Sequence, residues 1–284
     1  MTPRIVHKVA ETRAIVAGWR AAGERIALVP TMGALHEGHL TLVRAARASC
    51  RRTIVSIFVN PTQFGPGADF DRYPRDLDSD VAKLATVGAD LAFAPNVMEM
   101  YPQGFATTVT VAGLTEGLCG PYRPGHFAGV ATVVSKLLNQ TTPDAAFFGE
   151  KDFQQLQVVR RLARDLDMPV EIVGVPTVRE ADGLAMSSRN AYLTAGERAK
   201  AATIYRSLAQ AARDLQAGAA SANVIARGKS ELAAAGFDPI DYVAVVDADT
   251  LKPIPRASGN TRIAIAAWLG KTRLIDNLAV EARL

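Results

Sequence analysis

Residues 26–40 read Ile-Ala-Leu-Val-Pro-Thr-Met-Gly-Ala-Leu-His-Glu-Gly-His-Leu, and this stretch decides the fold class. Its first four residues form a short apolar run, which predicts a buried parallel strand. Gly33 permits a sharp turn, because glycine adopts backbone conformations that other residues avoid. The segment from Leu40 to Ser49 then has the spacing of a helix. A strand that passes through a glycine turn into a helix is the repeating step of an α/β fold.

The same alternation of apolar runs and helical segments continues along the chain. Further buried strands are predicted at residues 53–59, 91–94, 145–148 and 170–175. Further helices are predicted at residues 76–87, 130–139 and 153–166. This order predicts a Rossmann-like, doubly wound parallel sheet, in which ligands bind beyond the carboxyl ends of the strands.

The sequence changes in character after about Val178. Alanine-rich segments at residues 196–216 and 222–235 predict two helices, and residues 242–246, 262–268 and 272–275 predict short antiparallel strands. We therefore expect two domains. Residues 1–176 form the predicted Rossmann-like nucleotide-binding domain, and residues 177–284 form a smaller C-terminal α+β domain.

The composition is that of an ordinary globular protein, with 284 residues, 49% of them hydrophobic and 21% charged. The net charge is only +4, and no Lys/Arg block stands out beyond Arg51-Arg52, so nucleic acid is not an expected partner. A mild positive charge suits small anionic substrates. No apolar run approaches the ~20 residues that a membrane span needs. Two isolated cysteines, Cys50 and Cys119, and an N-terminus without a signal-type apolar run favour the cytoplasm.

Two of the four histidines, His36 and His39, lie in the turn that opens the first predicted helix. Amides at a helix N-terminus favour phosphate, and imidazoles three residues apart share one helical face as additional donors. Gly38 leaves room for a nucleotide to approach the backbone. The alternatives are a capped helix with two surface histidines, or a zinc site. Zinc is weakly supported, because no cysteine or committed carboxylate accompanies the pair.

Three further clusters follow predicted strands or lie near the domain boundary. Asn60 and Gln63 offer neutral amides that recognise hydroxyls and carboxylates. Lys151 can hold phosphate as a point charge, with Gln155 one helical turn further on. The stretch 186–190, Met-Ser-Ser-Arg-Asn, offers two hydroxyls and an arginine for phosphate oxygens. Taken singly, each cluster is more often a turn with solvated polar side chains, but together they form a coherent nucleotide and carboxylate site.

The His-x-Gly-His turn and the later Met-Ser-Ser-Arg stretch resemble the superfamily that includes class I aminoacyl-tRNA synthetases and small nucleotidylyltransferases. Longer strings narrow this to the pantothenate synthetase (pantoate–β-alanine ligase) family, in family order and at family-like spacing. These strings lie at residues 30–39, 58–64, 118–127, 148–155 and 186–190. The resemblance covers essentially the whole chain, with its C-terminal third more loosely matched.

The resemblance implies that pantoate and ATP give pantoyl adenylate and pyrophosphate, after which β-alanine displaces AMP. It also implies Mg²⁺, a homodimer and a C-terminal domain that closes over ATP. It places pantoate between Gln63 and Gln155, beside Pro30, Met32 and Asn60, with β-alanine also near Gln63. The residues implied to bind ATP are Met32, Gly33, Ala34, Leu35, His36, Glu37, Gly38, His39, Gly149, Glu150, Lys151, Asp152, Val178, Met186, Ser187, Ser188 and Arg189.

The expected chemistry agrees with this set. Pantoate's carboxylate is ionised at neutral pH, so the first step needs charge neutralised on the phosphates rather than a base. We assign His39 the role of proton donor or transition-state donor, supported by His36, Lys151 and Arg189. Residues 76–80 contain three aspartates that can reach a metal ion or form the acidic first turn of a helix, which the helix dipole favours.

Other functions remain as alternatives. A nucleotidylyltransferase shares the His-x-Gly-His turn but has no evident use for the pair Gln63 and Gln155. A tRNA synthetase needs a tRNA-binding domain, for which neither room nor basic surface is left. A non-catalytic nucleotide-binding regulator has no need to keep both histidines together with Lys151 and Arg189.

Overall fold

The computed structural model describes residues 2–65 and 69–281. The chain separates into two compact units. The first consists of Met1–Ala112, Arg123–Glu150 and Gln155–Pro176, and the second of Gly113–Tyr122, Lys151–Gln154 and Thr177–Leu284. The last change of unit lies between Pro176 and Thr177, but two short earlier segments group with the second unit. The division into residues 1–176 and 177–284 stays a prediction.

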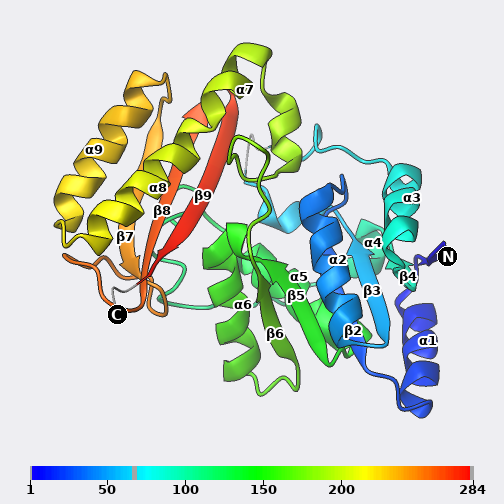
Figure 1. Ribbon diagram of the computed structural model, residues 1–284. Helices are drawn as coiled ribbons and strands as arrows, with labels where there is room; N and C mark the ends of the chain where they lie inside the picture. Colours follow the sequence, from blue (N-terminus) through cyan, green and yellow to red (C-terminus); the bar gives the residue numbers. More distant parts are fainter. Residues whose placement is uncertain (1, 66–68, 282–284) are drawn as a thin grey trace. The chain divides into compact units, whose positions relative to one another are not determined.

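A six-stranded parallel sheet forms the centre of the first unit (Figure 1). Its strands are β1 (Arg4–Val6), β2 (Ile26–Thr31), β3 (Arg52–Ile57), β4 (Leu91–Phe93), β5 (Ala145–Gly149) and β6 (Glu171–Val175). The spatial order is β1-β4-β3-β2-β5-β6, and all paired neighbours are parallel. The predicted doubly wound fold is therefore confirmed. The order reverses between β2 and β5, and ligands of such sheets bind beyond the carboxyl ends of strands at this position.

Most helices of this sheet agree with the prediction. The helices are α1 (Val9–Ala21), α2 (Glu37–Ser49), α3 (Leu77–Val87), α4 (Val97–Met100), α5 (His126–Thr141) and α6 (Phe153–Asp165), with 3-10 turns at Pro61–Gln63 and Glu150–Asp152. The helix predicted at 130–139 begins four residues earlier, after Gly125 at φ +77°. The three-residue edge strand β1 and the four-residue α4 were not predicted, because elements this short show no measurable periodicity.

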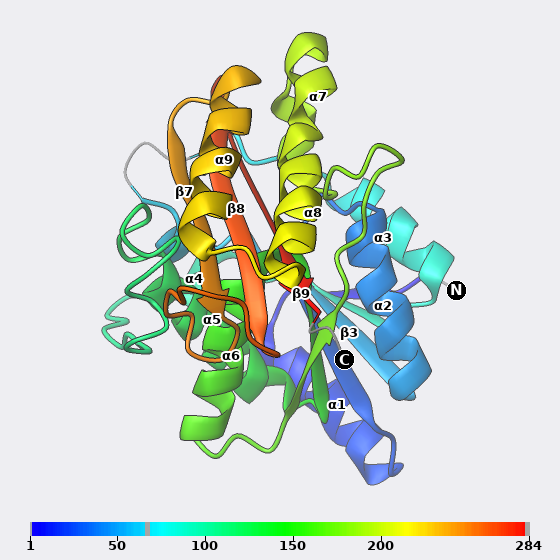
Figure 2. The ribbon, with the colours of Figure 1, turned by 60° about the vertical axis from the view of Figure 1, so that its left-hand side comes forward.

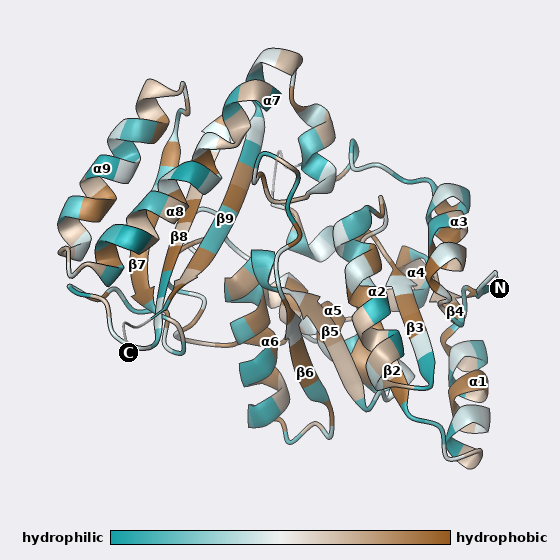
Figure 3. Ribbon diagram, in the orientation of Figure 1, coloured by the Kyte–Doolittle hydropathy of each residue, from teal (hydrophilic) through white to brown (hydrophobic). Residues whose placement is uncertain are grey.

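Helices cover both faces of this sheet. Ala27 and Val29 pack with Val43 of α2 in one buried cluster. On β6, Val175 belongs to the same cluster, whereas a Cβ at Gly174 would lie 2.9 Å from Cδ2 of Leu156 in α6. Neighbouring strand residues point to opposite faces, so α2 and α6 cover different faces. Figure 3 shows the amphipathic colouring of α6 that this position requires.

An antiparallel three-stranded sheet forms the centre of the second unit (Figure 2). Its elements are η3 (Ser188–Tyr192), α7 (Ala195–Ala201), α8 (Thr203–Gln216), α9 (Ser221–Ala234), β7 (Ile240–Asp247), β8 (Thr261–Leu269) and β9 (Thr272–Val280). The single helix predicted at 196–216 is wrong, since Ala202 at ψ −8° separates α7 from α8. Strand β9 extends beyond the predicted residue 275, because it pairs with β8 as far as Thr261.

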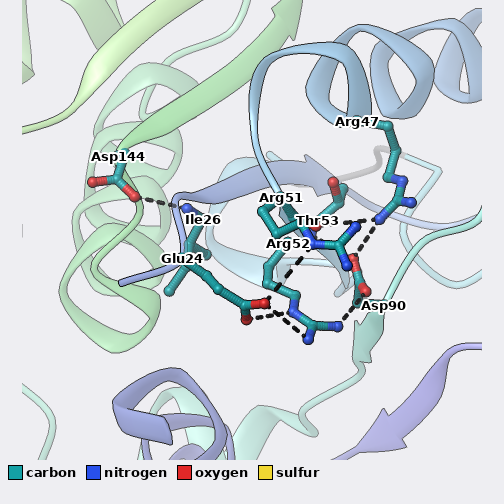
Figure 4. Close-up of polar contacts among 8 residues, drawn as sticks. All are labelled: Glu24, Ile26, Arg47, Arg51, Arg52, Thr53, Asp90 and Asp144. Carbon is teal, nitrogen blue, oxygen red and sulfur yellow. Dashed lines mark hydrogen bonds and ion pairs between the residues drawn. The ribbon is translucent and has the colours of Figure 1, made fainter. Parts of the chain in front are cut away.

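Aspartates hold the amino ends of two central strands in the first unit (Figure 4). Asp144 accepts the amide of Ile26, the first residue of β2, at 2.7 Å. Asp90 accepts the Thr53 amide of β3 at 2.8 Å and also binds Arg47 and Arg52, both at 3.0 Å. The side chain of Asp90 is only 16% exposed, so these donors satisfy a largely desolvated carboxylate.

Replacing Asp90→Ala should lower the free energy of unfolding by about 2 kcal/mol, because it leaves the Thr53 amide without its acceptor and removes one partner from each of two arginines. The matched control is Glu11→Ala, whose exposed pair with Arg4 should contribute less than about 0.5 kcal/mol. Urea unfolding of both variants measures the difference. Equal losses would show that Asp90 acts only as a surface ion pair.

Candidate active site

Two histidines cap the helix that follows β2. His36 is the N-cap of α2, and its Nδ1 accepts the Gly38 amide at 3.1 Å. The Nδ1 of His39 accepts the His36 amide at 3.3 Å, and the ring centroids lie 4.1 Å apart. A ring nitrogen that accepts an N–H carries no proton, so each neutral ring has its proton on Nε2. The capping contacts therefore turn both rings into Nε2–H donors beside the N-terminus of a helix.

A buried carboxylate from a different helix holds the turn before these histidines. Asp80 of α3 is 2% exposed and accepts the amides of Ala34 at 2.9 Å and Leu35 at 2.7 Å. Burial raises the pKa of the Asp80 carboxyl, and the two amide hydrogen bonds oppose that rise. Gly33 has φ +82°, and a Cβ there would lie 2.9 Å from the Asp80 carboxylate. The glycine turn is thus required both by backbone conformation and by the close approach of Asp80.

The acidic first turn of α3 is structural. Asp76 caps α3 by accepting the Ser79 amide at 3.0 Å, and Asp80 binds the turn described above. Within residues 2–65 and 69–281 there is no group of three or more His, Cys, Asp or Glu side chains arranged for a metal ion. The acidic residue of the histidine turn, Glu37, is exposed and paired with Arg44, which lowers the pKa of its carboxyl.

The second predicted cluster forms one connected network after β3. Asn60 is 1% exposed and donates to Oε1 of Gln63 at 3.1 Å. Nε2 of Gln63 lies 2.9 Å from the sulfur of Met32, which also joins this cluster to the β2 turn. Tyr101 donates from its hydroxyl to Oδ1 of Asn60 at 2.8 Å. These contacts fix the orientation of the Gln63 amide.

The start of α5 holds the backbone of the same loop. Nδ1 of His126 lies 2.9 Å from the Gln63 carbonyl, and Arg123 lies 3.1 Å from Nε2 of that ring. An arginine only donates, so Nε2 accepts and Nδ1 carries the proton that binds the carbonyl. Gly129 completes the contact, since a Cβ at this position would lie 2.3 Å from the carbonyl oxygen of Thr62.

The third predicted cluster is divided between the two units. Gly149, Glu150 and Gln155 belong to the first unit, and Gln155 is half-buried on α6. Lys151 and Asp152 belong to the second, with Nζ of Lys151 4.0 Å from the Asp152 carboxylate.

The fourth predicted cluster lies wholly in the second unit. Val178 accepts the amide of Met186 at 2.9 Å, which brings these two predicted residues together. Ser187 caps the turn Ser188–Tyr192 by accepting the Arg189 amide at 3.3 Å. The serine–arginine stretch therefore forms a capped 3-10 turn, and its role toward phosphate stays a prediction.

Sequence reasoning missed several side chains that hold these clusters. The sequence indicates Asp80 only as a metal ligand or first-turn acid, and His126 only as part of a family-like string. Tyr101 and Asn277 gave no local signal, because their contacts join segments that are distant in the chain.

Comparison with known proteins gives consistent relatives over the full chain. A family profile described as pantoate-beta-alanine ligase matches residues 4–279. The chain is 58% identical over 277 residues to a pantothenate synthetase of Paramagnetospirillum magneticum, with 98% of both chains covered. The structure of this chain is similar to that of pantothenate synthetase from Thermus thermophilus. The TM-score is 0.93 at 51% identity, covering 98% of this chain and 99% of that one.

A more distant solved structure has the same fold and carries ligands. It is pantoate-beta-alanine ligase from Francisella tularensis, complexed with beta-gamma ATP and beta-alanine. The TM-score is 0.83 at 32% identity, covering 99% of both chains.

Replacing Gly129→Ala should lower the free energy of unfolding by about 1–3 kcal/mol and displace the Gln63 loop, because the new methyl group meets backbone atoms. Gly18→Ala in α1 is the matched control. Nothing lies within 4 Å of a Cβ at Gly18, so this change should stabilise the helix by about 0.5–1 kcal/mol. Chemical unfolding of both variants measures the difference, and a stabilised Gly129→Ala would rule out the close packing of α5 on the loop.

Proposed function

This chain belongs to the pantoate–beta-alanine ligase family and condenses pantoate with β-alanine, and we propose that it does so through an enzyme-bound pantoyl adenylate. ATP is the co-substrate. The observation that carries this mechanism is the pair of Nε2–H donors from His36 and His39 at the start of α2. Donors fixed in advance stabilise charge as it develops, without reorganising during the reaction.

In the first step, a carboxylate oxygen of pantoate attacks the α-phosphorus of ATP and the bond to the bridging β-phosphate oxygen breaks. No base is needed, since the carboxylate is already ionised. Negative charge moves onto pyrophosphate, and we assign the donors for it to His36, His39, Lys151 and Arg189. We assign His39 the role of proton donor or hydrogen-bond donor in the transition state. Support comes from the fixed tautomers in the first unit and from the ordered Ser187 turn in the second.

We assign the ATP-binding surface to the fixed backbone segments around these donors. The proposed set is Met32, Gly33, Ala34, Leu35, His36, Glu37, Gly38, His39, Gly149, Glu150, Lys151, Asp152, Val178, Met186, Ser187, Ser188 and Arg189. Glu37 contributes through its backbone, because its side chain is exposed and paired with Arg44.

We assign pantoate to Gln63 and Gln155, with Pro30, Met32 and Asn60 beside it. The Asn60 contact holds the Gln63 amide in one orientation, which suits recognition of a hydroxyl or carboxylate. In the second step, the neutral amine of β-alanine attacks the acyl carbon, AMP leaves, and the amine loses a proton. Excluding water protects the adenylate from hydrolysis, which is the proposed purpose of closure by the C-terminal unit.

Magnesium fits this site as a companion of ATP. Mg²⁺ binds mainly through substrate phosphates and water rather than a dedicated protein cage. When bound, it neutralises charge on the phosphates. The residues that we assign to ATP would hold the ion together with the phosphates.

The adenylate route predicts that labelled pyrophosphate exchanges into ATP when pantoate and Mg²⁺ are present and β-alanine is absent. With β-alanine added, the products should be pantothenate, AMP and pyrophosphate. Lys151→Ala should reduce exchange by about 100-fold through loss of a phosphate donor. Exchange that depends on β-alanine, or release of ADP, would contradict the stepwise scheme. A stable dinucleotide product would instead favour a nucleotidylyltransferase. The absence of any turnover would favour a non-catalytic nucleotide-binding regulator.

We also propose a homodimer in the cytoplasm. Closed twofold assemblies are the commonest oligomers, and light scattering should give about 60 kDa, twice the chain mass of 30.2 kDa. A monomer at micromolar concentration would contradict this assembly.

The described residues contain no helix long and apolar enough to cross a membrane. Cys50 and Cys119 are unpaired and buried, as in a reducing compartment, and cell fractionation tests this location.

A further inference from the structure

One asparagine of the C-terminal sheet contacts the segment that carries Lys151. Asn277 of β9 is 5% exposed, and its Nδ2 donates to the backbone carbonyl of Lys151 at 2.9 Å. Its Oδ1 accepts Nε of Arg262 at 2.6 Å. The Arg262 guanidinium lies 3.7 Å from the centroid of the Phe153 ring. Asn277 and Arg262 therefore contact the short segment Lys151–Gln154 at Lys151 and at Phe153.

The neighbouring residue on β9 holds the turn that lies between Val178 and Met186, two residues of the proposed ATP site. Asp276 is 3% exposed and binds both Nη atoms of Arg179, at 2.5 and 3.0 Å. Arg179 also donates to the carbonyl of Gly183 at 3.1 Å, and its guanidinium lies 4.3 Å from the Tyr205 ring. Burial raises the pKa of the Asp276 carboxyl, against the hydrogen bonds of Arg179. The amide of Asn277 donates to Asp276 at 2.8 Å, which links the two contacts.

We propose that Asn277 is a positioning residue for Lys151. Asn277 holds the Lys151 backbone, its neighbour Asp276 holds the Arg179–Gly183 turn, and this pair of β9 residues therefore sets the position of one segment relative to the other. The inference rests on the proposed role of Lys151 toward ATP. A lysine that carries a point charge on a flexible stem stabilises phosphate only if its backbone is fixed. Both segments therefore contact the same strand and belong to the same unit.

The chemistry of the contact requires an amide at position 277. One end of the side chain must donate to a carbonyl, and the other must accept from an arginine. Aspartate has nearly the same shape and still accepts from Arg262, but it has no donor for the Lys151 carbonyl. Asn277→Asp therefore removes the contact with Lys151 while keeping the contact with Arg262. This separates positioning of Lys151 from general stability of the sheet.

The experiment compares Asn277→Asp, Lys151→Ala and the double variant in the full-length enzyme. Readouts are pyrophosphate exchange, the Kd for ATP by calorimetry and the KM for pantoate. Asn277→Asp should lower exchange by about 10- to 100-fold, as expected when a reacting group is displaced by about 1 Å. The KM for pantoate should change by less than about twofold. In the Lys151→Ala background, the same substitution should change exchange and ATP affinity by less than about twofold, because it acts through Lys151.

Asn223→Asp is the matched control, since it adds the same charge at an exposed position of α9 in the same unit. It should leave exchange unchanged, and thermal unfolding verifies that all variants fold. Normal exchange in Asn277→Asp, or a full additional loss in the double variant, would overturn the inference while leaving the proposed function intact. Normal exchange in Lys151→Ala would instead remove Lys151 from ATP binding, and the inference would fall with it.

Discussion

The constraint on which the site depends is that the backbone amides after β2 need acceptors. A chain leaving a buried strand and entering a helix exposes several amides that have no partner within the helix. His36, His39 and Asp80 supply those acceptors. The same contacts fix the imidazole tautomers and the shape of the glycine turn. If the proposed role of the histidines is right, the contacts that satisfy these amides also orient the donors for the reaction.

The loop after β3 follows the same logic with different groups. Its carbonyl at Gln63 is held by His126, its side chain by Asn60, and its backbone lies against the first turn of α5 at Gly129. A recognition side chain held at both its amide and its backbone loses little conformational entropy when a substrate binds. The loop of Gln63, to which we assign pantoate, is thus held by a helix that is buried along most of its length.

In the second unit, residues of the sheet hold the segments proposed to bind ATP, whereas in the first unit residues of helices hold them. Strand β9 holds the Lys151 segment through Asn277 and the Arg179 turn through Asp276. The Asp276–Arg179 ion pair is buried, so each of its charges depends on its partner being present. The residues proposed to bind ATP therefore belong to both units, each of which has its own core.

The sequence by itself determined most element types and the parallel sheet. It also contains the His-x-Gly-His motif and the serine–arginine motif. Apolar runs, helical spacing and glycine turns are local properties, so β2, α2, β5 and α6 were all predictable from their own residues. It did not determine the short edge strand β1 or the break at Ala202, where a few residues carry too little pattern. Only the tertiary structure decided that Asp80, His126 and Asn277 hold the site. The physical reason is that each binds a backbone group dozens of residues away, and the pairing of such groups depends on how the strands are ordered.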